Sequence, residues 1–185
     1  IICDVGVDMI KIASFDLGNL PFISRIAEKG LPVVISTGGG NLDDVKASVA
    51  ILQSNVEDIS VLHCVSEYPC THDRLGLETI QDYIDEFPGC RIGVSDHFSG
   101  VLSGPVAYLL GARVFEKHVT LNRALKGTDH SFALEPHGFQ SFCRDIKRVP
   151  EMLPRKNDGT LGNEAVFQKL GKSIVAASDL SEGQE

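Results

Sequence analysis

Two short segments of the sequence each place an acidic side chain and a histidine at the end of an apolar run. VSDHFSG occupies residues 94–100 and VFEKHVT occupies residues 114–120. Imidazole is a common protein ligand for first-row divalent metals, so His97 and His118 could hold one ion between them if the two runs end side by side. Taken singly, each is more often a structural histidine. A shared site therefore depends on the elements that position the two residues.

Five apolar, β-rich runs supply candidate strands for this positioning. Runs that are apolar on both faces are typical of buried parallel strands, because helices cover the sheet. Their limits are close to residues 7–13, 32–37, 59–65, 90–95 and 113–118. The runs that end in His97 and His118 are neighbours in the chain, which favours neighbouring places in a sheet.

The segments between these runs have the period of amphipathic helices. Apolar residues recur three or four positions apart, so that one face of each helix can pack on the sheet. One such stripe is Leu42, Val45, Val49 and Leu52, and a second is Leu77, Ile80, Tyr83, Ile84 and Phe87. A last helix is expected to begin at Glu135-Pro136, because proline suits the first turn. The alternation of strand and helix predicts an α/β fold.

Polar residues follow all five runs, and this distribution favours a barrel. Catalytic groups spread over many strand ends are typical of (β/α)8 TIM barrels, whereas a doubly wound sheet gathers its ligand contacts at one crevice. Five βα units are too few to close a ring of eight. The residues alone therefore allow either a five-stranded open sheet or a barrel with three strands upstream of Ile1.

Composition excludes several classes of function. The 185 residues are 43% hydrophobic and carry a formal net charge of −8, which suits a single core but not a nucleic acid or an anionic membrane as partner. No apolar run approaches the roughly 20 residues that span a bilayer. An odd number of cysteines without metal-knuckle spacing predicts reduced thiols and a cytoplasmic protein. The cysteines are Cys3, Cys64, Cys70, Cys90 and Cys143.

Six motifs, in this order and at these intervals, resemble the sialic acid synthases and their legionaminic and pseudaminic acid relatives. They are KIASFDLGNLP, VVISTGG, VLHCVSEYP, IGVSDH, FEKHVT and KGTDHSFALEP. The resemblance implies a (β/α)8 TIM barrel of which this chain covers about the fourth to the eighth βα units. It also implies a partial barrel over residues 1–153, a linker over 154–170 and, over 171–185, the truncated start of an antifreeze-like (SAF) domain.

The resemblance further implies a reaction. Members of this family condense phosphoenolpyruvate with an open-chain N-acylated amino sugar, such as N-acetylmannosamine or a 2,4-diacetamido hexose. They use a divalent metal and form a nine-carbon 2-keto acid with release of phosphate. By this resemblance His97 and His118 are the metal ligands, the metal is expected to be Mn²⁺, with Mg²⁺ or Co²⁺ as alternatives, and the protein is expected to be a homodimer. Asp96 could either orient His97 or cap the following helix.

A second group of residues matches the positions at which the family holds phosphoenolpyruvate. A lysine supplies charge and three serines supply hydroxyl donors, which is the chemistry that a phosphate needs in an acidic protein. These residues are Lys11, Ser14, Ser36 and Ser95. The run Gly38-Gly39-Gly40 could add backbone N–H groups, although the family more often has a bulky apolar residue where Gly39 stands. Lys11 is expected to be a buried lysine at a strand end.

The sugar is expected to face Tyr68, Glu116 and Asp129 by the same resemblance, with Ser66 beside Tyr68. Asp16 and Glu116 are the candidates for acid/base catalysis. Solvated strand-end carboxylates are the plainer interpretation of both acids.

Three further residues close to the site are expected to have no part in it. Lys117 should point outward, and His63 with Cys64 should belong to the core rather than form a nucleophilic pair.

Two alternative functions use the same residues differently. A metal-dependent hydrolase or a class II aldolase could use the histidine pair on a TIM barrel, but it would leave Lys11 and the serines unexplained. An inactive fragment is the other alternative, because a five-stranded piece exposes two sheet edges and is expected to be neither stable nor active by itself.

Overall fold

The computed structural model describes residues 5–155 and 162–183 of the chain. The chain divides into two compact units, Ile1–Glu151 and Met152–Glu185. Across the described ranges, none of the helices combines the length and the apolar character that a membrane crossing needs. Cys64, Cys70, Cys90 and Cys143 are free thiols, and Cys3 lies outside the described residues.

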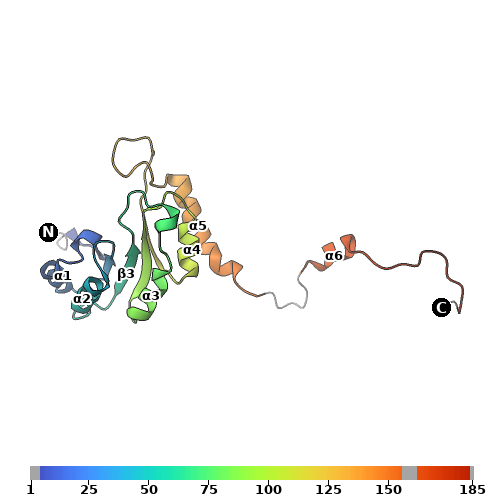
Figure 1. The fold of residues 1–185 in the computed structure, drawn as a ribbon, viewed down its shortest axis with the longest axis horizontal. Coiled ribbons are helices and arrows are strands. Elements are labelled where there is room, and N and C mark those ends of the chain that lie inside the picture. Colours follow the sequence, from blue (N-terminus) through green and yellow to red (C-terminus); the bar gives the residue numbers. More distant parts are fainter. Residues whose placement is uncertain (1–4, 156–161, 184–185) are drawn as a thin grey trace. The chain divides into compact units, whose positions relative to one another are not determined.

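The first unit is built on a sheet of five parallel strands that lie side by side in chain order, β1-β2-β3-β4-β5 (Figure 1). Each predicted run coincides with one of them, although the first run shortens to three residues and β4 extends one residue past its run, to Asp96. The strands are β1 Ile10–Ile12, β2 Val33–Ser36, β3 Ile59–Cys64, β4 Arg91–Asp96 and β5 Val114–Lys117. All six residues of the central strand β3 are buried, whereas the four residues of the edge strand β5 are half-buried.

Helices join successive strands, and because every crossover leads to the next strand they cover one face of the sheet. They are α1 Leu20–Ala27, α2 Leu42–Leu52, α3 Thr79–Glu86 and α4 Ser103–Leu109, with α5 Pro136–Met152 after β5 and short 3₁₀ helices η2 Ser14–Asp16 and η3 His72–Arg74. The α2 stripe packs as predicted except that Leu42, the first residue of the helix, is exposed. In the α3 stripe Ile84 is exposed.

Local sequence explains where α2 begins. Asn41 accepts hydrogen bonds from the backbone N–H groups of Asp43 and Asp44, while the Asp44 carboxylate accepts from the Asn41 N–H. This reciprocal capping box satisfies donors that would otherwise lack partners at the helix start. The helix therefore begins directly after the glycine run that follows β2.

The second unit contains one helix, α6 Glu164–Leu170, among its described residues. Asn163 begins it by accepting a hydrogen bond from the N–H of Val166. The helix lies inside the segment 154–170 that the sequence predicts as a linker. The described residues from 171 to 183 contain no helix or strand, and their assignment to an antifreeze-like domain stays a prediction.

Candidate active site

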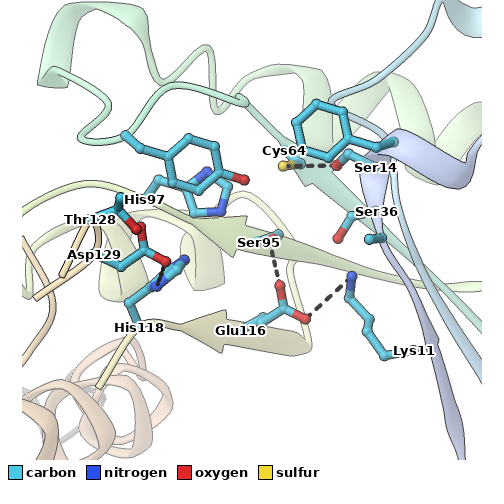
Figure 2. Close-up of a pocket in the computed structure, with 13 residues that line it drawn as sticks. Lys11, Ser14, Ser36, Cys64, Ser95, His97, Glu116, His118, Thr128 and Asp129 are labelled. Atoms are coloured by element: carbon cyan, nitrogen blue, oxygen red, sulfur yellow. Dashed lines mark hydrogen bonds and ion pairs between the residues drawn. The ribbon is translucent and has the colours of Figure 1, made fainter. Parts of the chain in front are cut away.

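A pocket of about 430 Å³ opens at the carboxyl ends of the five strands (Figure 2). Every residue predicted for the site lines it except Asp16 and Ser66. Parallel strands bring their ends to one edge of the sheet, which is why residues far apart in the sequence meet here. The lining consists of Lys11, Ala13, Ser14, Phe15, Ser36, Cys64, Tyr68, Ser95, His97, Glu116, His118, Thr128 and Asp129.

One corner of the pocket gathers hydroxyl groups and a lysine. The Ser14 hydroxyl donates to Cys64 Sγ at 3.3 Å and accepts from the Gly38 N–H at 3.0 Å. Ser36 is 2% exposed, and its Oγ has no hydrogen-bond partner. A buried hydroxyl without a partner is destabilising, so Ser36 is a donor held ready for a ligand.

The glycine run after β2 allows the loop at residues 38–40 to pack directly against the turn at Ser14. A Cβ at Gly39 would lie 2.0 Å from the carbonyl oxygen of Ser14, and one at Gly38 would lie 2.4 Å from Ser66 Oγ. The backbones of the 38–40 loop and the Ser14 turn therefore touch. A bulky residue at Gly39, which the family more often has, requires a different path for one of these segments.

Glu116 links the hydroxyl corner to the centre of the pocket. Its Oε1 accepts from Ser95 Oγ at 2.6 Å, and its Oε2 lies 3.4 Å from Lys11 Nζ. The side chains of Lys11 and Glu116 are 33% and 43% exposed, so water screens this ion pair. Lys11 is thus less buried than expected, because β1 is an edge strand and leaves it open on one side.

The two histidines lie together at the other end of the pocket (Figure 2). Their ring centroids are 5.3 Å apart with planes at 68°, and the Tyr68 ring lies 4.2 Å from that of His97. His97 Nδ1 is 2.7 Å from the carbonyl oxygen of Val65. A carbonyl accepts, so Nδ1 carries the proton and Nε2 is left free. Burial lowers the pKa of His97, while the Val65 carbonyl acts in the opposite direction.

This geometry fits a metal ion held by two imidazoles. His97 has its second nitrogen fixed by a backbone carbonyl, which is the usual support of a metal-ligating histidine. His118 Nδ1 lies 3.7 Å from Asp129 Oδ2. Within the described ranges no group of three or more His, Cys, Asp or Glu side chains is placed to hold a metal. Water and substrate oxygens would have to complete the coordination.

Asp96 has a role that neither sequence-based interpretation describes. Its carboxylate does not contact the His97 ring, whose Nδ1 is taken by Val65. Instead it accepts from the Phe98 N–H and the Ser103 hydroxyl, and it pairs with Lys117 Nζ at 2.7 Å. Lys117 does not line the pocket, but its side chain is 2% exposed and so it does not reach solvent. Burial lowers the pKa of Lys117, against the effect of Asp96.

The structure leaves two predicted residues outside the lining and adds others. Asp16 lies in η2, and the Ser66 hydroxyl is 3.9 Å from Sγ of the lining residue Cys64. Cys64 is buried, as predicted, and it also lines the pocket. The signal for it was strand register, because Cys64 pairs with Ser95, which pairs with Glu116. Other residues not predicted for the site are Ala13, Phe15 and Thr128.

His63 and Cys64 do not form a nucleophilic pair. His63 is buried, does not line the pocket and has its Nε2 2.7 Å from the Leu75 carbonyl oxygen. Adjacent residues of a strand point to opposite faces, which separates the two side chains.

Comparison with known proteins identifies the family of this chain. The model of the NeuB family matches residues 1–158. The chain belongs to the NeuB family. N-acetylneuraminate-9-phosphate synthase of Homo sapiens is 35% identical to this NeuB chain over 181 residues, 97% of this chain and 50% of the relative. N,N'-diacetyllegionaminic acid synthase of Campylobacter jejuni is 32% identical over 188 residues, 98% of this chain and 55% of the relative.

A solved structure agrees with the fold. The N-acetylneuraminic acid synthetase of Leptospira borgpetersenii, crystallised with citrate, superimposes with a TM-score of 0.78 at 30% identity, covering 90% of this chain and 57% of that one. The NeuB chain described above spans about half the length of the curated relatives that it matches.

Proposed function

We propose that the intact protein condenses phosphoenolpyruvate with an open-chain N-acylated amino sugar, forming a nine-carbon sialic-type 2-keto acid and releasing phosphate. The observation that carries this proposal is one pocket with two chemically different ends. A lysine and serine hydroxyls lie at one end and a histidine pair at the other. Relatives that match nearly the whole chain bear the names of sialic and legionaminic acid synthases.

In this proposal the hydroxyl corner binds phosphoenolpyruvate. Lys11 offers a positive charge, and the partly exposed ion pair with Glu116 costs little to break. Ser36 has a free hydroxyl that can donate to a phosphate oxygen. Ser14 and Ser95 already have partners, and their hydroxyls complete the anion site by exchanging them for the ligand.

His97 and His118 would hold a divalent metal, with Mn²⁺ proposed and Mg²⁺ or Co²⁺ as alternatives. Such an ion supplies Lewis-acid polarisation of the sugar aldehyde. Tyr68 packs against both imidazole rings, so it orients the end of the pocket at which that aldehyde would lie. Thr128 and Asp129 border the same end and can bind sugar hydroxyls.

Glu116 is proposed to move the protons. C3 of phosphoenolpyruvate forms a bond to the aldehyde carbon, the aldehyde oxygen gains a proton, and water adds at C2 before phosphate leaves. Glu116 stands between the two ends of the pocket and is hydrogen-bonded to Ser95, so it can reach both reacting carbons. Asp16 stays a prediction, since it lies outside the lining, and Ser66 is proposed only to support the pocket wall.

The finer architecture is also a proposal. We infer an eight-stranded barrel in which β1 to β5 are the fourth to the eighth strands, followed by an antifreeze-like domain, in a homodimer. Supporting the barrel, the outer edges of β1 and β5 pair with no other strand among the described residues. The matched relatives are about twice as long as this chain.

The test is phosphate release from phosphoenolpyruvate by the intact protein. N-acetylmannosamine and a 2,4-diacetamido hexose are compared, with Mn²⁺ or with EDTA. We expect release that requires a sugar and a metal, and that falls at least a hundredfold, about 2.7 kcal/mol, in His97→Ala and His118→Ala. His72→Ala, at an exposed position in η3, is the matched control. Folded protein that releases no phosphate with either sugar would favour the hydrolase or aldolase alternative.

A further inference from the structure

A buried ion pair lies immediately before the two pocket histidines. Lys117 Nζ is 2.7 Å from Asp96 Oδ2, and the side chains are 2% and 0% exposed. Asp96 ends β4, Lys117 ends β5, and the two residues are register partners. They precede His97 and His118 in the chain. The pair is thus the last contact between the two strands before the chain enters the site.

The pair faces away from the pocket. Neither residue lines it, whereas the residues before and after each of them do, as the alternation of side chains along a strand requires. On the other face, the Ser103 hydroxyl of α4 donates to Asp96, and Lys117 Nζ lies 5.8 Å from the centre of the Phe142 ring of α5. The two strand ends are therefore joined to each other and to the helices behind them.

Stability alone does not explain why charges are used here. Removing a carboxylate and an ammonium group from water has a large cost, and well-packed apolar side chains in their place are often as stable or more stable. The pair is well satisfied, since Asp96 Oδ1 accepts from the Phe98 N–H and Lys117 also donates to the Phe98 carbonyl. Fixing a register is the best-attested use of such buried charges.

Few hydrogen bonds hold His118 in place. His118 Nδ1 is 3.7 Å from Asp129 Oδ2, beyond hydrogen-bond distance, so this contact does not fix the ring. Its backbone is held on the other side, where the Leu134 N–H donates to the His118 carbonyl at 2.9 Å. The His118 ring also packs against the rings of Tyr68 and Phe132, and Lys117, the residue before it, fixes the end of β5 from which it projects.

Resting on the metal role proposed for the two histidines, we propose that the Asp96–Lys117 ion pair is a positioning device. It sets the separation of the His97 and His118 rings and thereby the affinity of the pocket for a divalent metal ion.

The experiment is a Co²⁺ titration of the intact protein without phosphoenolpyruvate or sugar, followed by visible absorption. The variants are Lys117→Met and the double variant Asp96→Asn/Lys117→Met. Lys46→Met is the matched control, since Lys46 forms an exposed pair with Glu86 at 2.9 Å. We expect Co²⁺ affinity to fall about tenfold or more in both Lys117 variants, with a changed spectrum. Lys46→Met should match the wild type.

Thermal unfolding of the metal-free proteins separates positioning from simple stability. The double variant leaves no unpaired buried charge, so its midpoint should lie closer to the wild type than that of Lys117→Met. Recovered stability with weakened Co²⁺ binding supports the proposal. A double variant that binds Co²⁺ with the affinity and spectrum of the wild type overturns it.

If the double variant does not fold, Co²⁺ binding by Ser103→Ala tests the proposal instead. It keeps both charges and removes one hydrogen bond that orients Asp96. An affinity for Co²⁺ about threefold weaker supports the proposal, and an unchanged affinity overturns it.

The proposed reaction and this inference fail in different ways. Wild-type protein that releases phosphate but shows no Co²⁺ binding at the histidines overturns the positioning role and leaves the reaction standing. Wild-type protein that binds Co²⁺ but releases no phosphate overturns the reaction, while the variants still measure the positioning effect.

Discussion

Replacing Ser36 is expected to affect ligand binding and protein stability in opposite directions. It is buried without a partner, whereas Ser48, equally buried, donates to the Leu17 carbonyl at 2.6 Å. An unpaired polar group destabilises a folded protein, and a paired one stabilises it. The same residue type therefore has opposite effects at the two positions.

Ser36→Ala is expected to raise the free energy of unfolding of the intact protein by up to about 1 kcal/mol, because it removes a buried hydroxyl without a partner. It should also raise the KM for phosphoenolpyruvate about tenfold, since the ligand loses a hydrogen bond to a charged group. Urea unfolding and steady-state kinetics measure the two effects.

Ser48→Ala is the control, with stability lowered by about 1 kcal/mol and KM unchanged. A stability loss in Ser36→Ala equal to that in Ser48→Ala would contradict the prediction.

His63 is expected to make stability depend on pH. Burial lowers its pKa, with the bond to the Leu75 carbonyl acting in the opposite direction. The unfolded chain therefore takes up a proton near pH 6.5 while the folded chain takes it up only at lower pH. Stability should be full above pH 6.5 and fall below it. His63→Gln should flatten the fall in urea midpoints between pH 7 and 5, and an unflattened profile would refute this.

His72→Gln, at an exposed position in η3, is the matched control and should leave the pH profile unchanged. Burial lowers the pKa of His97 too, so the His63 variant should reduce the slope without abolishing it.

At the level of single residues, the apolar runs predicted where the strands end, whereas the choice of Lys11, the serines, Tyr68 and Asp129 among the polar residues there came from the resemblance of six motifs to a known family. Cys64 could not be recognised in this way, since a cysteine in an apolar run is also typical of a core. Only its alignment with Ser95 and Glu116 reveals it. The burial of Lys117 was also missed, because its partner Asp96 lies on another strand and the pair exists only once the register is known.

At the scale of elements, the loop after β2 and the turn η2 depend on each other. Their backbones touch at Gly39 and Ser14. The sequence shows a glycine run but not what approaches it, because that contact joins segments from two different βα units. Strand limits were predicted within a few residues, and the largest difference, at β1, reflects an edge strand that has a neighbour on one side only.

Gly39→Ala is expected to lower the free energy of unfolding by about 1–3 kcal/mol, because the new Cβ would overlap the Ser14 carbonyl. It should also raise the KM for phosphoenolpyruvate by displacing the Ser14 hydroxyl. Thermal unfolding and kinetics of the intact protein measure both. Gly18→Ala, where no atom lies within 4 Å of the added Cβ, should behave as the wild type. Equal effects at the two glycines would show that the contact is unimportant.

At the scale of the molecule, the two unpaired edges of the sheet are expected to determine how the chain behaves when it is produced alone. The outer edges of β1 and β5 pair with no strand in the described ranges, and such edges recruit strands from other chains. Residues 1–185 produced alone are therefore expected to self-associate. Sedimentation velocity should show a mass that rises with concentration, and activity should be absent. A monomer with a cooperative melt and full turnover would contradict this expectation.

The order of the strands has a consequence for synthesis on the ribosome. Each strand from β2 to β5 pairs with the one that precedes it in the chain, so each of these strands can dock on structure that has already emerged. The pocket becomes complete only at the end, because Lys11 and Ser36 come from the first two strands whereas Glu116 and His118 come with the last. A ligand that touches both groups binds only chains in which all five strands are in place, and it stabilises them over intermediates in which β5 has not yet docked.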